Sequence, residues 1–218
     1  CGYYLEHGRM APQDFLQILS GFDAIFLGAV GYPGVPDHVS LWGLLLPIRR
    51  AFQQYINLRP IRLLRGIDSP LAGKGPAEID MFVVRENTEG EYSSMGGRLH
   101  EGTPYEVVVQ NTVFTRHGTE RVIRYAFELA KRHGRSKVTA ATKSNGINHT
   151  MPFWDELFKA EAARHPDIAT ELIHIDALAA MFVLRPERFQ VVVASNLFGD
   201  ILTDLGAAIA GSIGIAPS

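Results

Sequence analysis

Short, apolar, β-branched runs alternate along the chain with longer amphipathic stretches, and this alternation limits the possible folds more than any other feature. The apolar runs favour strands at 23–30, 79–86, 136–143, 171–176 and 191–195. The amphipathic stretches favour helices at about 42–55, 119–132, 151–164, 177–184 and 199–210. Strands that alternate with helices are typical of a sheet covered by helices, so we predict an α/β fold.

Local signals mark the ends of several predicted elements. Thr119 is a typical helix N-cap residue, and Gly134 follows the predicted end of the same helix. Pro47 interrupts the helical pattern of 42–55, which predicts either a late start of that helix or a kink. The alternating segment 104–115 predicts one arm of a hairpin. Because no G-x-G-x-x-G follows a predicted strand, the usual dinucleotide fingerprint of a Rossmann fold is absent.

Composition excludes several classes of partner. The net charge is -2, so nothing in the sequence predicts binding to nucleic acid or to an anionic membrane. The apolar runs are short or broken by glycine and predict no membrane span. Cys1 is the only cysteine, which suits a reducing compartment and favours a cytoplasmic protein. Since the chain opens on Cys1 without a signal peptide and stops in a Gly-rich apolar stretch, we expect the interior of a longer polypeptide.

Two aspartates, Asp200 and Asp204, lie four residues apart in the otherwise apolar stretch NLFGDILTDLGAAIAGS (196–212). Like charges at this spacing share one helix face and repel each other, so solvent, a basic partner or a bound cation must stabilise them. Carboxylate oxygens are ligands that Mg²⁺ and Mn²⁺ prefer. The alternative is a position at the helix start, where the dipole favours carboxylates; this explains Asp200 better than Asp204.

Other ionisable or polar residues stand near the ends of predicted strands and helices, where an α/β fold binds its ligands. Arginines that converge there would form a pocket for a small dianion, because a guanidinium binds a carboxylate through paired hydrogen bonds. Each residue alone also has an ordinary explanation, such as a surface ion pair. Together they favour a metal-assisted enzyme that acts on an acid. The residues are Arg49, Arg59, Arg85, Tyr92, Lys143, Asn145 and Asp176.

Four segments resemble, in this order, the metal-dependent β-decarboxylating dehydrogenases of the isocitrate/isopropylmalate dehydrogenase family. They are NLRP (57–60), VVRENTEGEYSSMGGR (83–98), ATKSNG (141–146) and ASNLFGDILTDLGAAIAGSIGIAPS (194–218). The resemblance covers nearly the whole chain, and it is closest to the branch of the family that acts on tartrate and D-malate.

The resemblance implies a fold with two domains around a central cleft, which is not a Rossmann fold. Residues 1–54 and 211–218 would belong to a discontinuous large domain on the cofactor side, truncated at both ends. Residues 55–210 would form the domain for dimerisation, substrate and metal, with a hairpin arm at about 92–115. The family also implies a homodimer with shared active sites, in which the arm interlocks the two subunits.

The resemblance implies roles for the substrate-facing residues. Arg49, Arg59 and Arg85 would hold the carboxylates of the substrate. Tyr92 would protonate the enolate carbon, and Lys143 would help to remove the proton of the substrate hydroxyl.

The metal and cofactor residues follow from the same resemblance. Asp176, Asp200 and Asp204 would ligate Mn²⁺ or Mg²⁺, with Asp176 reaching into the partner's site. Asn145 and Asn196 would contact NAD; NADP stays open, because the segment that binds the adenosine half is missing. For the same reason we expect this fragment alone to be inactive.

The implied activity is the oxidation and decarboxylation of a 2-hydroxy diacid, either D-malate or tartrate. Isocitrate enzymes of the family place a serine and an asparagine where Gly43 and Leu45 stand here, and neither of these can donate a side-chain hydrogen bond. The alternatives are a 3-isopropylmalate dehydrogenase, a non-catalytic regulatory subunit of the same family, and a ligand-binding α/β domain without chemistry. The last two leave Lys143, Tyr92 and the three aspartates without a use.

Overall fold

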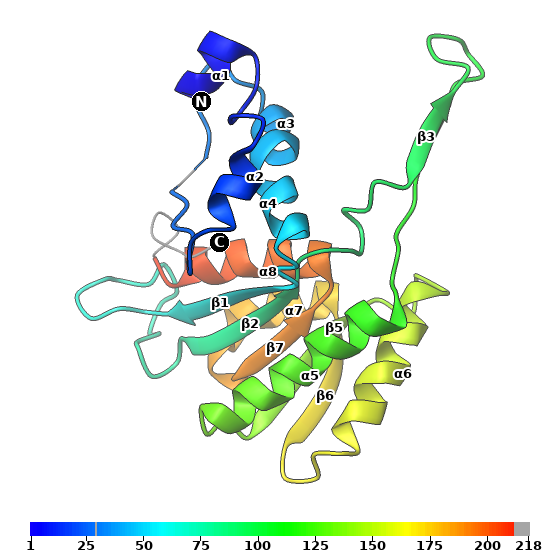
Figure 1. Cartoon of the computed structure of the whole chain (residues 1–218). Coiled ribbons are helices and arrows are strands. Elements are labelled where there is room, and N and C mark those ends of the chain that lie inside the picture. Colours follow the sequence, from blue (N-terminus) through cyan, green and yellow to red (C-terminus); the bar gives the residue numbers. More distant parts are fainter. Residues whose placement is uncertain (29, 212–218) are drawn as a thin grey trace. The chain divides into compact units, whose positions relative to one another are not determined.

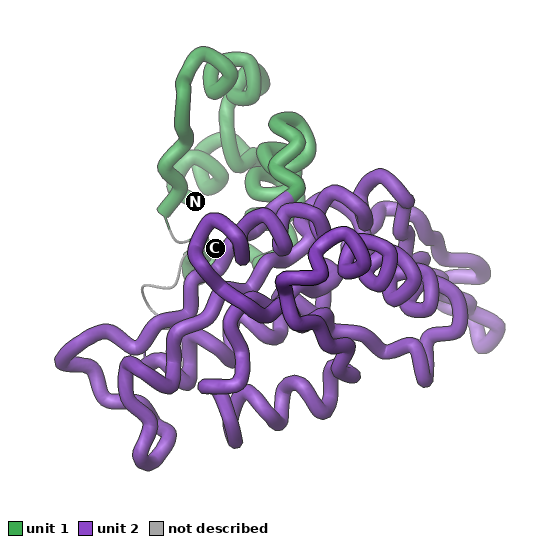
Figure 2. Tube along the Cα trace, turned by 90° about the horizontal axis from the view of Figure 1, so that it is seen from below, with its two compact units in different colours: residues 1–55 green, residues 56–218 purple. Residues whose placement is uncertain are grey.

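The computed structural model describes residues 1–28 and 30–211 (Figure 1). The chain divides into two compact units, Cys1–Tyr55 and Ile56–Ser218 (Figure 2). The predicted placement of 212–218 in the large domain therefore lies outside the described residues. Within the described residues, no helix is long and apolar enough to cross a membrane.

The first unit is helical. It contains α1 (Gly2–His7), α2 (Phe15–Leu19), α3 (Asp37–Ser40), a π-helix (Leu41–Leu45) and α4 (Leu46–Ala51). Pro47 lies in the first turn of α4, but the backbone is already helical from Asp37, so the late start is wrong. Proline cannot donate to the carbonyl four residues before it, and the helix is widened to π over the residues that precede α4.

The strand predicted at 23–30 is wrong for the residues described there, which form no strand. An apolar run becomes a strand only where another strand pairs with it. Phe26 is instead 98% exposed, so the apolar character of this run does not reflect burial in this unit.

The second unit is built on a five-stranded sheet (Figure 1). The strands are β1 (Ile56–Arg62), β2 (Asp80–Glu86), β5 (Lys137–Thr142), β6 (Ala169–His174) and β7 (Val191–Ala194), in the order β1-β2-β7-β5-β6. β1 runs antiparallel to β2, and the other neighbours are parallel. The α/β prediction is confirmed, and so are the strands at 79–86, 136–143 and 191–195. The strand predicted at 171–176 is displaced by two residues, because the helix that follows β6 already begins at Ile175.

Helices cover both faces of this sheet. On one face lie α5 (Arg116–Arg132) and α6 (Thr150–Ala162); on the other lie α7 (Ile175–Leu184), the short 3-10 helix Pro186–Arg188 and α8 (Asn196–Ile209). The side chains of each strand alternate between the two cores, since successive residues point to opposite faces. On β2, Phe82 and Val84 pack in the core with α5 and α6, while Met81 and Val83 pack in the core with α7 and α8.

The N-cap of α5 differs from the prediction. Thr115 occupies that position, and its hydroxyl accepts a hydrogen bond from the backbone N–H of Gly118. Thr119 is buried inside the first turns of the helix. The predicted end is confirmed, because Gly134 follows the C-cap residue with a left-handed φ of 62°.

A hairpin projects from the second unit (Figure 1). Its strands are β3 (Gly96–Leu99) and β4 (Val107–Gln110), which pair antiparallel and are exposed throughout. This confirms the predicted hairpin. Three consecutive valines of β4 are exposed, which is unusual for a strand that belongs only to its own chain.

Candidate functional site

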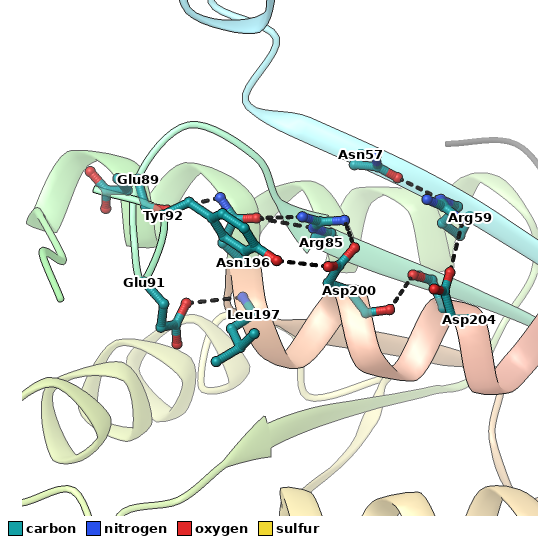
Figure 3. A network of polar contacts seen from close by, with 11 residues as sticks. Asn57, Arg59, Arg85, Glu89, Glu91, Tyr92, Asn196, Leu197, Asp200 and Asp204 are labelled. Atoms are coloured by element: carbon teal, nitrogen blue, oxygen red, sulfur yellow. Dashed lines mark hydrogen bonds and ion pairs between the residues drawn. The ribbon is translucent and has the colours of Figure 1, made fainter. Parts of the chain in front are cut away.

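Arg85 lies at the carboxyl end of β2, beside the first turns of α8 (Figure 3). Its side chain is 95% buried, and its charge is satisfied by two residues of α8. Nε and one terminal nitrogen donate to Oδ1 of Asn196 at 3.0 and 2.8 Å, and the other terminal nitrogen pairs with Asp200. A buried guanidinium with this set of partners is fixed in place, because each lost partner would leave a buried donor unpaired.

Close approach of α8 to Arg85 requires a glycine. A Cβ atom on Gly199 would lie 2.6 Å from both Cβ and Cγ of Arg85, which is closer than atoms can pack. The sequence places Gly199 between Asn196 and Asp200, and so both partners can reach the same guanidinium.

Tyr92 shares the carboxylate of Asp200 with Arg85. Its hydroxyl donates to Oδ2 of Asp200 at 2.8 Å, and the guanidinium of Arg85 lies 5.6 Å from the centre of its ring. Burial raises the pKa of Tyr92, and the hydrogen bond and negative charge of Asp200 raise it further. The hydroxyl therefore stays protonated at neutral pH, and the same shift makes it a weaker acid.

Arg59, on the neighbouring strand β1, approaches the second aspartate. Its Nε donates to Oδ1 of Asn57 at 3.1 Å, and a terminal nitrogen lies 3.9 Å from Asp204. Burial and the nearby charge of Arg85 lower the pKa of Arg59, whereas Asp204 and Asp200 oppose this change. Arg59 and Arg85 thus place two positive charges along the face of α8 that carries the aspartates.

These contacts decide between explanations of the aspartate pair. α8 begins at Asn196, so Asp200 and Asp204 are its fifth and ninth residues, too far from its start for the dipole to explain both. Each carboxylate instead faces an arginine. The side chains remain 37% and 70% exposed, so carboxylate oxygens are accessible to a ligand. Oxygen donors of this kind fit Mg²⁺ or Mn²⁺.

Lys143 and Asp176 form a separate pair. Lys143 follows β5 and Asp176 lies in the first turn of α7, directly after β6; the two strands are parallel neighbours, which brings their carboxyl ends together. Nζ of Lys143 lies 2.9 Å from the carboxylate, and its hydrogen bond lowers the pKa of Asp176. Within residues 1–28 and 30–211, no three His, Cys, Asp or Glu side chains are placed to hold one metal ion. The three predicted ligands are therefore not gathered within the described chain.

The remaining predicted residues lie elsewhere. Arg49 is on α4 in the first unit. Asn145 is exposed in the turn after β5, where the N–H groups of Gly146 and Ile147 bond to the carbonyl of Lys143. Asn196 was predicted to contact a cofactor; the structure shows it buried, with its amide nitrogen donating to the carbonyl of Glu89 at 2.9 Å.

Two residues of the network were missed in the sequence. Asn57 orients Arg59, and its position in NLRP, two residues before that arginine, was an available signal. Glu91 bonds to Ser195 and Leu197, about a hundred residues further along the chain, and no local pattern could indicate such a partner.

Comparisons with known proteins agree on one family. The sequence profile described as isocitrate/isopropylmalate dehydrogenase matches residues 2–218. The chain is 62% identical to D-malate dehydrogenase [decarboxylating] of Escherichia coli and 56% identical to tartrate dehydrogenase/decarboxylase of Pseudomonas putida. These alignments cover 100% of this chain but 61% and 60% of the relatives, so the chain spans about three fifths of their length.

A solved structure is similar over the same extent. The crystal structure of isocitrate dehydrogenase from Methylococcus capsulatus superposes with a TM-score of 0.85 at 32% sequence identity. It covers 99% of this chain, which in turn covers 61% of that protein.

The network yields a prediction for Asn196. Asn196→Ala removes the acceptor for two donors of a buried guanidinium, so the free energy of unfolding should fall by about 2 kcal/mol in urea titrations. Asn148→Ala, at an exposed position, is the control and should change it by less than about 0.5 kcal/mol. Equal effects of the two changes would show that the Arg85–Asn196 contact does not stabilise the fold.

Proposed function

Because the chain belongs to the isocitrate/isopropylmalate dehydrogenase family, we propose that it is part of an enzyme that oxidises and decarboxylates D-malate or tartrate with NAD or NADP. The names of its relatives support this branch of the family. The observation that carries the proposal is the face of α8, where two arginines, two aspartates and a tyrosine meet. Because the chain spans about three fifths of the length of its relatives, activity and metal binding are to be measured on the full-length enzyme.

Two arginines of this site suit the two carboxylates of a small diacid. Arg59 and Arg85 are buried at the base of the face, and each is already oriented by an asparagine. Oriented guanidinium groups lose little freedom when they bind a carboxylate, which favours affinity. We propose that Arg49 supplies a third contact from α4.

Asp200 and Asp204 would hold Mn²⁺ or Mg²⁺, with Asp176 of a second subunit as a further ligand. When bound, the cation would act as a Lewis acid that lowers the pKa of the substrate hydroxyl. Lys143 would accept the proton of this hydroxyl. Asn145 would contact the nicotinamide cofactor. Asn196 is buried against Arg85, so it would contact the cofactor only through the small part of its surface that remains exposed.

Tyr92 would complete the reaction. After loss of CO₂ the product carbon needs a proton, and the hydroxyl of Tyr92 is protonated at neutral pH for the reasons given above. Asp200 fixes the direction of that hydroxyl by accepting its hydrogen bond.

A homodimer would bring the two groups of site residues together. Lys143 and Asp176 are paired with each other, apart from the aspartates of α8, so a second chain can supply them to the site. The outer faces of α7 and α8 expose apolar side chains, as does the hairpin, and these surfaces would be covered in the dimer. The exposed residues of the helices are Val183, Leu184, Leu197 and Ile201.

The metal assignment predicts the effect of Asp204→Asn. Loss of one anionic ligand should weaken binding of Mn²⁺ to the full-length dimer by about tenfold or more in calorimetry. Asp167→Asn, at an exposed aspartate in the connection between α6 and the start of β6, is the matched control and should leave the affinity unchanged. Equal Mn²⁺ affinity in all three proteins would remove the metal assignment.

Shared sites predict recovery of activity in mixed dimers. A Lys143→Ala subunit combined with an Asp200→Asn subunit should give dimers with about half the activity of the unmodified dimer. One site then contains both defects and the other contains neither. Each variant should be nearly inactive alone. If exchange of subunits is verified by mass spectrometry and no activity returns, each site is built from one chain.

Substrate choice is predicted to depend on Trp42, which lies in the π-helix beside Gly43 and Leu45. In the family this segment faces the group on C3 of the malate, and a tryptophan there would leave room for hydrogen or hydroxyl only. In the full-length enzyme, Trp42→Ala should shift the ratio of kcat/KM toward 3-isopropylmalate by about 10–200-fold. Phe22→Ala, which removes an exposed aromatic ring of the same unit, should not shift it. An unmodified enzyme that prefers 3-isopropylmalate to D-malate would place the chain in another branch.

A further inference from the structure

The segment RENTEGEY contributes Arg85 and Tyr92 to the site, but its three glutamates have no part in the chemistry proposed above. All three carboxylates hold the loop between β2 and the hairpin. Glu86 accepts hydrogen bonds from the N–H groups of Thr88 and Glu89, within the loop itself. Glu89 fastens the loop to the start of α5, where it accepts from the N–H and the hydroxyl of Thr115.

Glu91 differs from the other two because it binds the helix that carries the aspartates (Figure 3). One carboxylate oxygen accepts from the hydroxyl of Ser195 at 2.8 Å, and the other accepts from the backbone N–H of Leu197 at 3.0 Å. Ser195 is the N-cap residue of α8, yet its side chain makes no capping hydrogen bond, and the first turn of α8 contains no acidic residue. Glu91 therefore supplies, from a distant segment, the negative charge and acceptor that this helix start lacks.

The position of Glu91 in the chain gives this contact a second consequence. Its neighbour is Tyr92, whose hydroxyl meets Asp200 on the same helix. Loop and helix are thus joined by the side chains of Glu91, at the first turn of α8, and of Tyr92, one turn further along, beside the hydrogen bond from the Asn196 amide to the backbone carbonyl of Glu89. We propose that Glu91 is a positioning residue. By binding the start of α8, it fixes the loop between β2 and the hairpin and so holds the hydroxyl of Tyr92 against Asp200.

This inference rests on the proposed function, in which Tyr92 is the proton donor. A carboxylate suits the task because both of its oxygens accept, one from a side chain and one from the backbone. Glutamine would keep the acceptor for Leu197, and its amide could donate to Ser195 instead of accepting. Glu91→Gln should therefore restore most of what Glu91→Ala loses.

The test compares Glu91→Ala in the unmodified full-length enzyme and in a Tyr92→Phe background, with D-malate, Mn²⁺ and NAD. With Tyr92 present, kcat should fall by about tenfold, a part of the usual effect of a general acid, while KM for D-malate stays within about twofold. In the Tyr92→Phe background, the same change should lower kcat by less than about twofold, because no hydroxyl is left to position. Equal factors in both backgrounds would mean that Glu91 acts on the fold and not through Tyr92.

Glu89→Ala is the matched control, since it releases the same loop from α5 and leaves the contact with α8. It should lower the melting temperature and change kcat by less than about twofold. Glu89→Ala would contradict the inference if it lowered kcat by the same tenfold and this loss disappeared in the Tyr92→Phe background. Any loss of a loop contact would then be sufficient, and Glu91 would have no special role.

A second measurement separates this inference from the proposed function. Tyrosine labelled with ¹³C at Cζ gives an NMR signal for Tyr92, identified by its absence in Tyr92→Phe. Glu91→Ala should shift this signal, and Glu89→Ala should not. If the unmodified enzyme turns over none of the hydroxy diacids, the proposed function fails and the NMR result alone decides the position of Tyr92. An unshifted signal in Glu91→Ala overturns the inference in either case.

Discussion

The buried guanidinium of Arg85 is the interaction on which the rest of the site depends. It is the last but one residue of β2, and its partners, Asn196 and Asp200, occupy successive turns of α8. Its burial is tolerable only because those partners satisfy it, and they can reach it only because Gly199 adds no side chain between them. One charge thus fixes the distance between sheet and helix, and the same carboxylate then orients Tyr92.

Sequence reasoning recovered the parts of this arrangement that depend on local spacing. Residues four apart on a helix must share a face, so the pairing of Asp200 with Asp204 could be predicted, as could Arg85 at the end of an apolar strand. β1 was missed because INLRPIR contains two arginines and a proline and lacks an apolar run, although it is an edge strand, where proline is tolerated. The strand predicted at 23–30 fails for the opposite reason, because its described residues, 23–28 and 30, are an apolar run that pairs with no described strand.

Contacts between distant segments could not be predicted from pattern. The cap that Glu91 provides for α8 joins residues more than a hundred positions apart. Thr119 was predicted as the N-cap of α5, whereas Thr115, the same residue type four positions earlier, occupies that position. In each case the contact that determines the cap is made by a carboxylate from a distant loop, which approaches the helix start only in the folded chain. The resemblance to a family implied roles for the residues, whereas the structure shows which side chains orient and neutralise them.

Solvent, a basic partner and a bound cation are compatible explanations for the aspartate pair, since Asp204 is 70% exposed and both carboxylates face an arginine. Arg59 and Arg85 balance the charges of Asp200 and Asp204, so the face of α8 is close to neutral. A divalent cation alone would leave this face positive, and a dianionic substrate alone would leave it negative. Together they would restore neutrality, so each should favour the binding of the other, as linkage requires. Lys143 and Asp176 neutralise each other and would enter such a site without changing this balance.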